Sequence, residues 1–189
     1  MIHTDFINIL KKVKELDEAA YDSLISNFHH AHCNKGKHLL RSQNTCDAIF
    51  FIESGILREY TLANDKEYNI WFSFEGSIVC DLQSFTHGHR SKKNIQCLSA
   101  VRYRYIKRQD LVKLASQYHV IETFYRKMVE VYFIEVEDRL LRMQTLNAKS
   151  HYDYLLKHYP HFIKAISLTH LASFLGITKE SLSRIRRQK

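Results

Sequence analysis

The residues best suited to bind a ligand lie near the end of the chain, where basic and hydroxyl side chains alternate with aliphatic ones. Residues 179–189 carry five basic side chains and one acidic side chain, in a chain of 189 residues whose net charge is +8. Such side chains on one helix face can hydrogen-bond to the bases and phosphates of DNA. The predicted DNA-contacting residues are Thr169, Thr178, Lys179, Glu180, Ser181, Ser183, Arg184 and Arg187.

The spacing of small residues before this helix predicts a helix-turn-helix. Ala172 lets two helices approach closely, and Gly176, four residues later, can supply the positive φ of a tight turn. Thr178 is a suitable N-cap for the second helix. That helix would enter the major groove of double-stranded DNA, with Glu180 accepting from cytosine and Arg184 donating to guanine. A small shared core is predicted from Leu171, Leu175, Ile177, Leu182 and Ile185.

The preceding chain predicts the elements that position this unit. Helical spacing over residues 6–28 indicates two short helices. From about residue 37 to 106, short aromatic and β-branched segments separated by turns indicate an antiparallel sandwich or barrel. We expect an α+β chain: a β-roll or jelly-roll barrel with flanking short helices over 1–119, a long connecting helix over 120–146, and a helix-turn-helix over 147–189.

The predicted long helix is apolar on more than one face, so it must bury more than one face. We expect it to pack on its own roll and also against a second copy, with Phe124, Met128 and Val131 making the dimer contact. One large groove within the chain is the alternative. A second, offset apolar stripe consists of Phe133, Val136, Leu140 and Met143.

The helix-turn-helix segment carries a resemblance to a known family. The sequence Lys179-Glu180-Ser181-Leu182-Ser183-Arg184 is similar to the Arg-Glu-Thr-Val-Ser-Arg recognition helix of the Crp/Fnr family of bacterial transcription regulators. The order of roll, long helix and helix-turn-helix resembles that family over nearly the whole chain. The resemblance implies a homodimer that binds double-stranded DNA, with RNA polymerase as a further partner. Lys179 replaces the family's arginine, and this replacement weakens one bidentate contact to a phosphate or a base. Because the chain ends near this helix, we do not expect the family's following wing.

The resemblance also implies a ligand pocket. The family's cyclic-nucleotide form uses a Gly-Glu-Leu segment and an Arg-Ser pair, which correspond here to Cys80-Asp81-Leu82 and Arg90-Ser91. Cys80 replaces the glycine that lets backbone approach phosphate, and Asp81 is one methylene shorter than glutamate. We therefore expect a degenerate pocket that does not respond to cyclic AMP and needs no cofactor. Binding of a cyclic nucleotide or of another small anionic effector is the alternative. In that case Arg90 would hold the anion, and a basic loop would lie at the rim of the pocket.

Composition argues against other classes of protein. No apolar run approaches the ~18 residues of a membrane span, and we see no secretory signal, so we expect a cytoplasmic protein with no membrane partner. The four cysteines form no C-x-x-C pair, so we expect reduced thiols and no metal. The sequence His29-His30-x-His32-Cys33 has suitable zinc ligands, but adjacent histidines point in different directions.

Two rival functions remain at this stage. The first is a ligand-binding module whose C-terminal helices contact another protein. The second is an enzyme with an active site in a cupin-like barrel, which would need histidine ligands that the predicted strands lack. No nucleophile elbow, phosphate-cradling loop or H-E-x-x-H helix is present, and Asp47 and Asp81 are single carboxylates without an evident partner, so we do not expect an enzyme.

Overall fold

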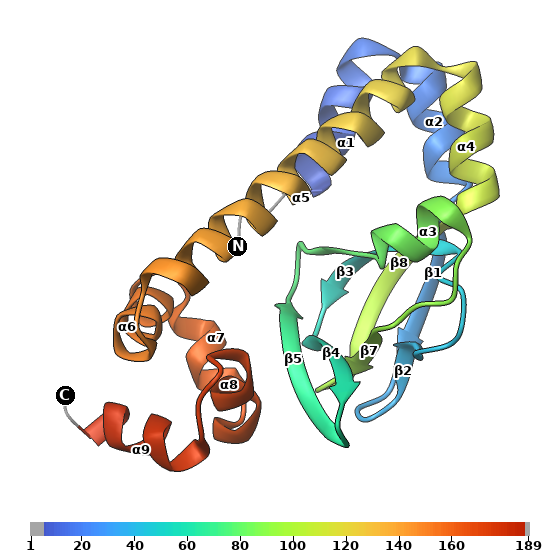
Figure 1. Cartoon of the computed structure of the whole chain (residues 1–189). Helices are drawn as coiled ribbons and strands as arrows, with labels where there is room; N and C mark the ends of the chain where they lie inside the picture. The colour runs from blue at the N-terminus through green and yellow to red at the C-terminus, as the bar shows by residue number, and fades with distance from the viewer. Residues whose placement is uncertain (1–5, 188–189) are drawn as a thin grey trace.

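Two four-stranded antiparallel sheets form a β-roll at the centre of the chain (Figure 1). The computed structural model describes residues 6–187. One sheet has the strand order β1-β8-β3-β6 and the other β2-β7-β4-β5. The predicted antiparallel roll is confirmed, although its sheets do not close into a barrel. The strands are β1 (His29–Cys33), β2 (His38–Leu40), β3 (Ala48–Ser54), β4 (Leu57–Ala63), β5 (Lys66–Ser73), β6 (Ile78–Val79), β7 (Asn94–Cys97) and β8 (Val101–Lys107).

Strand β3 shows how the roll acquires apolar contacts on two faces. Alternate side chains of a strand point to opposite faces of its sheet. Ile49 and Phe51 belong to a cluster with the helices, whereas Ile52 belongs to the cluster between the two sheets. All three side chains are at most 3% exposed. The segment therefore consists almost entirely of apolar residues rather than alternating with polar ones.

Four helical segments pack on one side of the roll (Figure 1). They are α1 (Phe6–Leu16), α2 (Glu18–Ser26), α4 (Arg108–Gln117) and the first half of α5 (His119–Thr145). Asp17 begins α2 by accepting a hydrogen bond from the Ala20 amide at 2.9 Å, as an N-cap should. A further short helix, α3 (Leu82–His87), follows β6. None of the helices within residues 6–187 is long and apolar enough to cross a membrane.

The chain after α5 forms a helical unit that lies beside strand β5 (Figure 1). Phe72 of β5 belongs to the core of this unit, and its ring meets that of Phe174 edge-on, with centroids 5.5 Å apart. The unit is thus anchored directly to the roll as well as through α5. It consists of α6 (Ala148–His158), α7 (Pro160–Ala165), α8 (Leu168–Phe174) and α9 (Lys179–Arg187).

The two apolar stripes of α5 differ in how far the chain itself covers them. Phe124 and Met128, which we expected at a dimer contact, are 5% and 8% exposed and lie in the core shared with α1, α2 and α4. That expectation is wrong for these two residues, because their own chain already covers them. Val131 is half-buried. The second stripe is the exposed one, and we call it the outer stripe: Phe133, Val136, Leu140 and Met143.

Candidate nucleic-acid interface and effector site

Helices α8 and α9 have the local geometry of a helix-turn-helix. Gly176 has a φ of +69°, which supplies the left-handed turn between them. The Ile177 amide donates to the Ala172 carbonyl at 3.0 Å, and Ala172 is 2% exposed where the helices meet. Thr178 caps α9, because its Oγ1 accepts a hydrogen bond from the Ser181 amide at 3.2 Å. Leu182 points into the shared core and is fully buried.

The outer face of α9 presents basic and hydroxyl side chains to solvent. Arg184 donates from Nη2 to Ser181 Oγ at 3.3 Å, and Arg187 donates from Nη2 to Ser183 Oγ at 3.3 Å. Lys179, Glu180, Arg184 and Arg187 are exposed, as are Thr178 and, on α8, Thr169. Helix α9 lies on the far side of α8 from the roll (Figure 1). The residues predicted to contact DNA therefore lie on α9, at its N-cap and on α8. The roll does not cover those that are exposed.

Arg58 of β4 links the roll to α8. Arg58 is 4% exposed, and its guanidinium donates from Nη1 to Glu67 Oε2 at 2.6 Å and contacts His170 Nδ1 at 3.2 Å. Burial and the positive charge of Arg58 lower the pKa of His170, so the ring is neutral and Nδ1 can accept this hydrogen bond. Nearby, the backbone N–H of Asn69 donates to Ser173 Oγ, and Ser173 Oγ in turn donates to the backbone carbonyl of Glu67, both at 3.0 Å.

A second polar cluster lies inside the roll, where the ligand pocket was predicted. Asp81 is 4% exposed and accepts a 2.6 Å hydrogen bond from Ser91 Oγ, so this carboxylate does have a partner. Lys93 Nζ lies 3.9 Å from Asp81 Oδ1 and 3.5 Å from Glu59 Oε2. Ser91 Oγ also accepts from the Lys93 amide at 2.9 Å. Two buried carboxylates thus share one ammonium group, and we call Glu59, Asp81, Ser91 and Lys93 the ammonium cluster.

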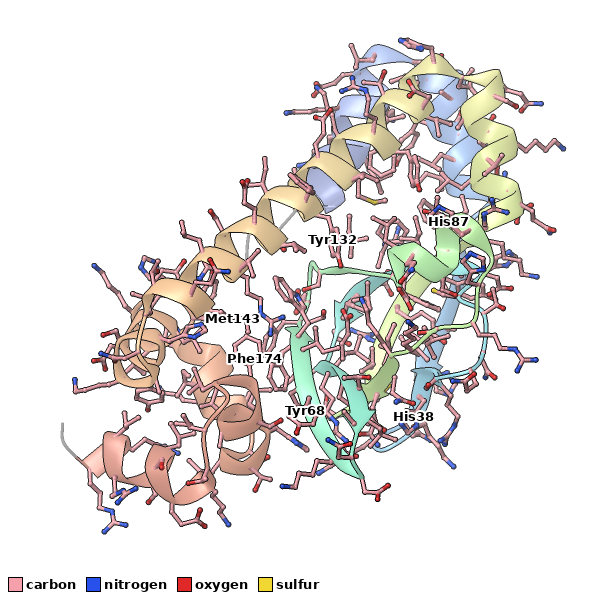
Figure 2. All side chains as sticks on the ribbon, in the orientation of Figure 1. His38, Tyr68, His87, Tyr132, Met143 and Phe174 are labelled. Carbon is pink, nitrogen blue, oxygen red and sulfur yellow. The ribbon has the colours of Figure 1, made fainter. Side chains whose placement is uncertain are left out.

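Helix α5 contributes two side chains close to this cluster. Tyr132 lies on the side of α5 that faces the roll (Figure 2), and burial raises the pKa of its phenol while the charge of Lys93 opposes that effect. Burial lowers the pKa of Arg139 to about 10, although the charge of Glu59 acts to raise it. The Arg139 guanidinium lies 5.2 Å from the Trp71 ring centre and 4.6 Å from that of Phe174. Arg139 therefore joins α5 to both the roll and the helix-turn-helix.

The other predicted pocket residues have different surroundings. Arg90 is exposed, whereas the neighbouring Ser91 is buried. Leu82 is half-buried in the first turn of α3. Cys80 Sγ lies 3.9 Å from Cys46 Sγ, a proximity that the sequence gives no sign of. Lys93 belongs to the loop after Arg90-Ser91 that was expected to form a basic rim, but its ammonium group contacts both carboxylates. Glu59, Tyr132 and Arg139 were missed because they come from distant segments. Among residues 6–187 no group of three or more possible metal ligands is found.

An apolar cleft of about 620 Å³ opens between β5, the end of α5 and the helix-turn-helix. Tyr68, Met143 and Phe174 lie around it (Figure 2). Three residues of the outer stripe, Val136, Leu140 and Met143, line its α5 side. Three of the four residues of the outer stripe therefore face this cleft.

Comparisons with known proteins agree with this architecture. Residues 31–118 match the family model of the cyclic nucleotide-binding domain. FixK2 from Bradyrhizobium japonicum is 18% identical, with a TM-score of 0.71 over 85% of this chain and 83% of that one. A protein from Eubacterium rectale assigned to the Crp/Fnr family of transcriptional regulators is 17% identical, with a TM-score of 0.71 over 93% and 84%. A CooA variant from Carboxydothermus hydrogenoformans is 18% identical, with a TM-score of 0.69 over 95% and 83%.

Fold and site together define a cyclic-nucleotide-binding-type β-roll that a long helix joins to a helix-turn-helix. The chain has the fold of Crp/Fnr regulators, so the resemblance that the α9 sequence indicated is confirmed at the level of the fold. The comparison with curated protein sequences finds no match for this chain.

Proposed function

We propose that this protein is a homodimeric, sequence-specific DNA-binding transcription regulator of the Crp/Fnr type, acting in the cytoplasm and without enzymatic activity. The observation that carries the proposal is the exposed basic face of α9 on a helix-turn-helix. In this account α9 enters the major groove, where Arg184 and Glu180 contact base edges. Lys179 and Arg187, with the hydroxyls of Thr169, Ser181 and Ser183, hold mainly phosphates.

The outer stripe supports dimerisation through α5. Its residues follow one another at intervals of three, four and three, which is the spacing of a coiled-coil seam. Phe133, Leu140 and Met143 are each more than half exposed, and apolar surface of this kind marks a contact site. A second copy packed along the stripe would place two α9 helices to read a near-palindromic site. For a regulator that activates, RNA polymerase is the further partner.

The roll in this proposal does not respond to cyclic AMP. Asp81, which would correspond to the ribose-binding glutamate, is already bonded to Ser91 and lies 3.9 Å from the Lys93 ammonium. Cys80 stands where close approach of phosphate to backbone needs glycine. Arg90, the expected anion ligand, is exposed. The roll then serves as a scaffold that sets the positions of α5 and of the helix-turn-helix.

Salt dependence separates this function from its rival, a ligand-binding module whose C-terminal helices contact a protein. Binding to a pool of random duplex DNA is measured by fluorescence anisotropy between 50 and 300 mM NaCl. DNA binding weakens with a log–log slope of about 0.9 for each phosphate contact. We expect a slope of at least about 3, and a smaller slope for Arg187→Ala than for Arg90→Ala. The absence of DNA binding at low salt would favour the rival function.

A further inference from the structure

The ammonium cluster has a charge pattern that a receptor for a phosphate would not have. Its two carboxylates, Glu59 and Asp81, are 8% and 4% exposed, and they belong to different segments of the roll. A buried carboxylate is stable only when it is paired or hydrogen-bonded. Among residues 6–187, Asp81 without Lys93 would keep only the hydrogen bond from Ser91, and Glu59 would keep only the charge of Arg139 as a positive influence. A positively charged group is therefore what this site requires.

Lys93 supplies that group from within the chain. Its side chain is 22% exposed, and its Nζ approaches both carboxylates. Burial by itself would lower the pKa of Lys93, yet the combined effects of Glu59, Tyr132 and Asp81 outweigh burial and the pKa is raised. The neighbouring Lys92 is exposed, so it serves as a matched control in the same loop.

We propose that the roll contains a receptor site for a primary ammonium group and that the ε-ammonium of Lys93 is its built-in occupant. Once the Lys93 side chain is shortened, the site would accept a free alkylammonium cation rather than an anionic nucleotide. Because the charges of Lys93 and Glu59 act on Tyr132 and Arg139 of α5, occupation of the site stabilises the position of α5 relative to the roll without a diffusible effector. Only this last, regulatory consequence rests on the proposed DNA-binding function.

Chemical rescue tests the occupant directly. In Lys93→Ala the site keeps its carboxylates and loses the part of the side chain beyond Cβ, which is a propylammonium group. We expect the Tm of Lys93→Ala to fall by about 5–15 °C, because an uncompensated buried charge is strongly destabilising. Added n-propylammonium chloride, which matches the lost fragment, should raise that Tm saturably. n-Propanol and NaCl at the same concentrations should not do so, and neither wild type nor Lys92→Ala should gain from the amine.

A second pair of variants keeps the proposal testable if Lys93→Ala does not fold. Lys93→Met retains the length of the side chain and removes only the charge. If the ammonium group serves Glu59, the loss of Tm from Lys93→Met should be smaller in a Glu59→Gln background than in wild type. Additive losses of Tm in the double variant would overturn the proposal. Rescue of Lys93→Ala by n-propanol to the same extent as by the amine would overturn it as well.

Titration of the wild type with cyclic AMP completes the test. We expect no change in Tm and no heat of binding in isothermal titration calorimetry. A saturable stabilisation by cyclic AMP would show an anion site and would contradict an ammonium receptor. None of these measurements uses DNA, so the ammonium site and the DNA-binding function can fail independently.

Discussion

The guanidinium of Arg58 lies 3.2 Å from Nδ1 of His170 and so connects the β-roll to the first helix of the helix-turn-helix. Arg58 is also hydrogen-bonded to Glu67 and Gln96, and it stacks on Tyr60 with its Cζ 4.0 Å from the ring centre. The donor is thus held in place from several sides. A neutral His170 is the form that can accept its hydrogen bond, so the contact depends on pH.

The pKa of His170 predicts the sign of this pH dependence. Burial and Arg58 lower its folded-state pKa below 6.5, so the stability it contributes is present above pH 6.5 and is lost as the pH falls through the folded pKa. The pKa values of His38 and His151 are lowered as well, so these residues also lose stabilising effect as the pH falls. The raised pKa of Glu59 changes stability with pH in the opposite direction. We expect the Tm to fall between pH 7 and pH 5.

The variant His170→Asn isolates the contribution of this contact. The asparagine Oδ1 can accept from Arg58 and does not titrate. Scanning fluorimetry at half-unit pH steps should show a shallower fall of Tm below pH 6.5 in His170→Asn than in wild type. If the two slopes are equal, His170 is not the titrating link between the roll and α8.

Charge in the outer stripe should separate the proposed dimer. The double variant Phe133→Glu with Leu140→Glu places two like charges on each copy at positions 66% and 55% exposed in the single chain. Both substitutions leave the core of the chain intact. Light scattering coupled to gel filtration should give half the mass of the wild type.

Val112→Glu is the matched control for this experiment, because Val112 is also an exposed apolar residue, 55% exposed, but lies on α4. It should keep the mass of the wild type. A double variant that stays dimeric would mean that the copies meet at another surface. Met128→Glu would unfold the chain instead, because Met128 lies in the core.

Two glycines of the roll should differ sharply in their tolerance of alanine. Gly36 and Gly55 have φ values of +81° and +101°, so alanine is strained at both, by about 1–2 kcal/mol. At Gly55 a Cβ would also overlap the Ala100 carbonyl oxygen and Val101, whereas at Gly36 it would meet no atom within 4 Å. The Tm of Gly55→Ala should therefore fall several degrees below that of Gly36→Ala. Equal values would show that the backbone at Ala100 can move away.

The helix-turn-helix could be predicted from the sequence because its constraints are local. Ala172, Gly176 and Thr178 lie within seven residues, and each has a role that only a few residue types can fill. The long helix was predicted over 120–146 and spans His119–Thr145, since no glycine or proline interrupts its apolar pattern. Strand β1 was not predicted, because its sequence of three histidines, alanine and cysteine has little β character and its pairing with β8 is distant in the chain.

Contacts between distant segments could not be predicted in the same way. Periodicity showed that Phe124 and Met128 share one face of α5 and Phe133 and Leu140 another, but not which face the chain itself covers. The role of Lys93 depends on Glu59, 34 positions earlier in the sequence, which the fold of β4 brings to 3.5 Å from it. One sequence without its fold contains no sign of that pairing.

Recovery of bound DNA from fragmented genomic DNA tests the central claim most directly. Purified wild-type protein, Arg184→Ala and the control Arg90→Ala are each incubated with the fragments without added effector, and bound fragments are sequenced. Loss of a bidentate arginine contact costs about 1–3 kcal/mol at one base pair. We predict that the fragments bound by wild type and by Arg90→Ala share an inverted repeat. With Arg184→Ala, the preference should relax at one position in each half-site of this repeat, or the repeat should disappear. No enriched sequence with wild type, or the same repeat unchanged in Arg184→Ala, would contradict the assignment of α9 as the DNA-reading helix.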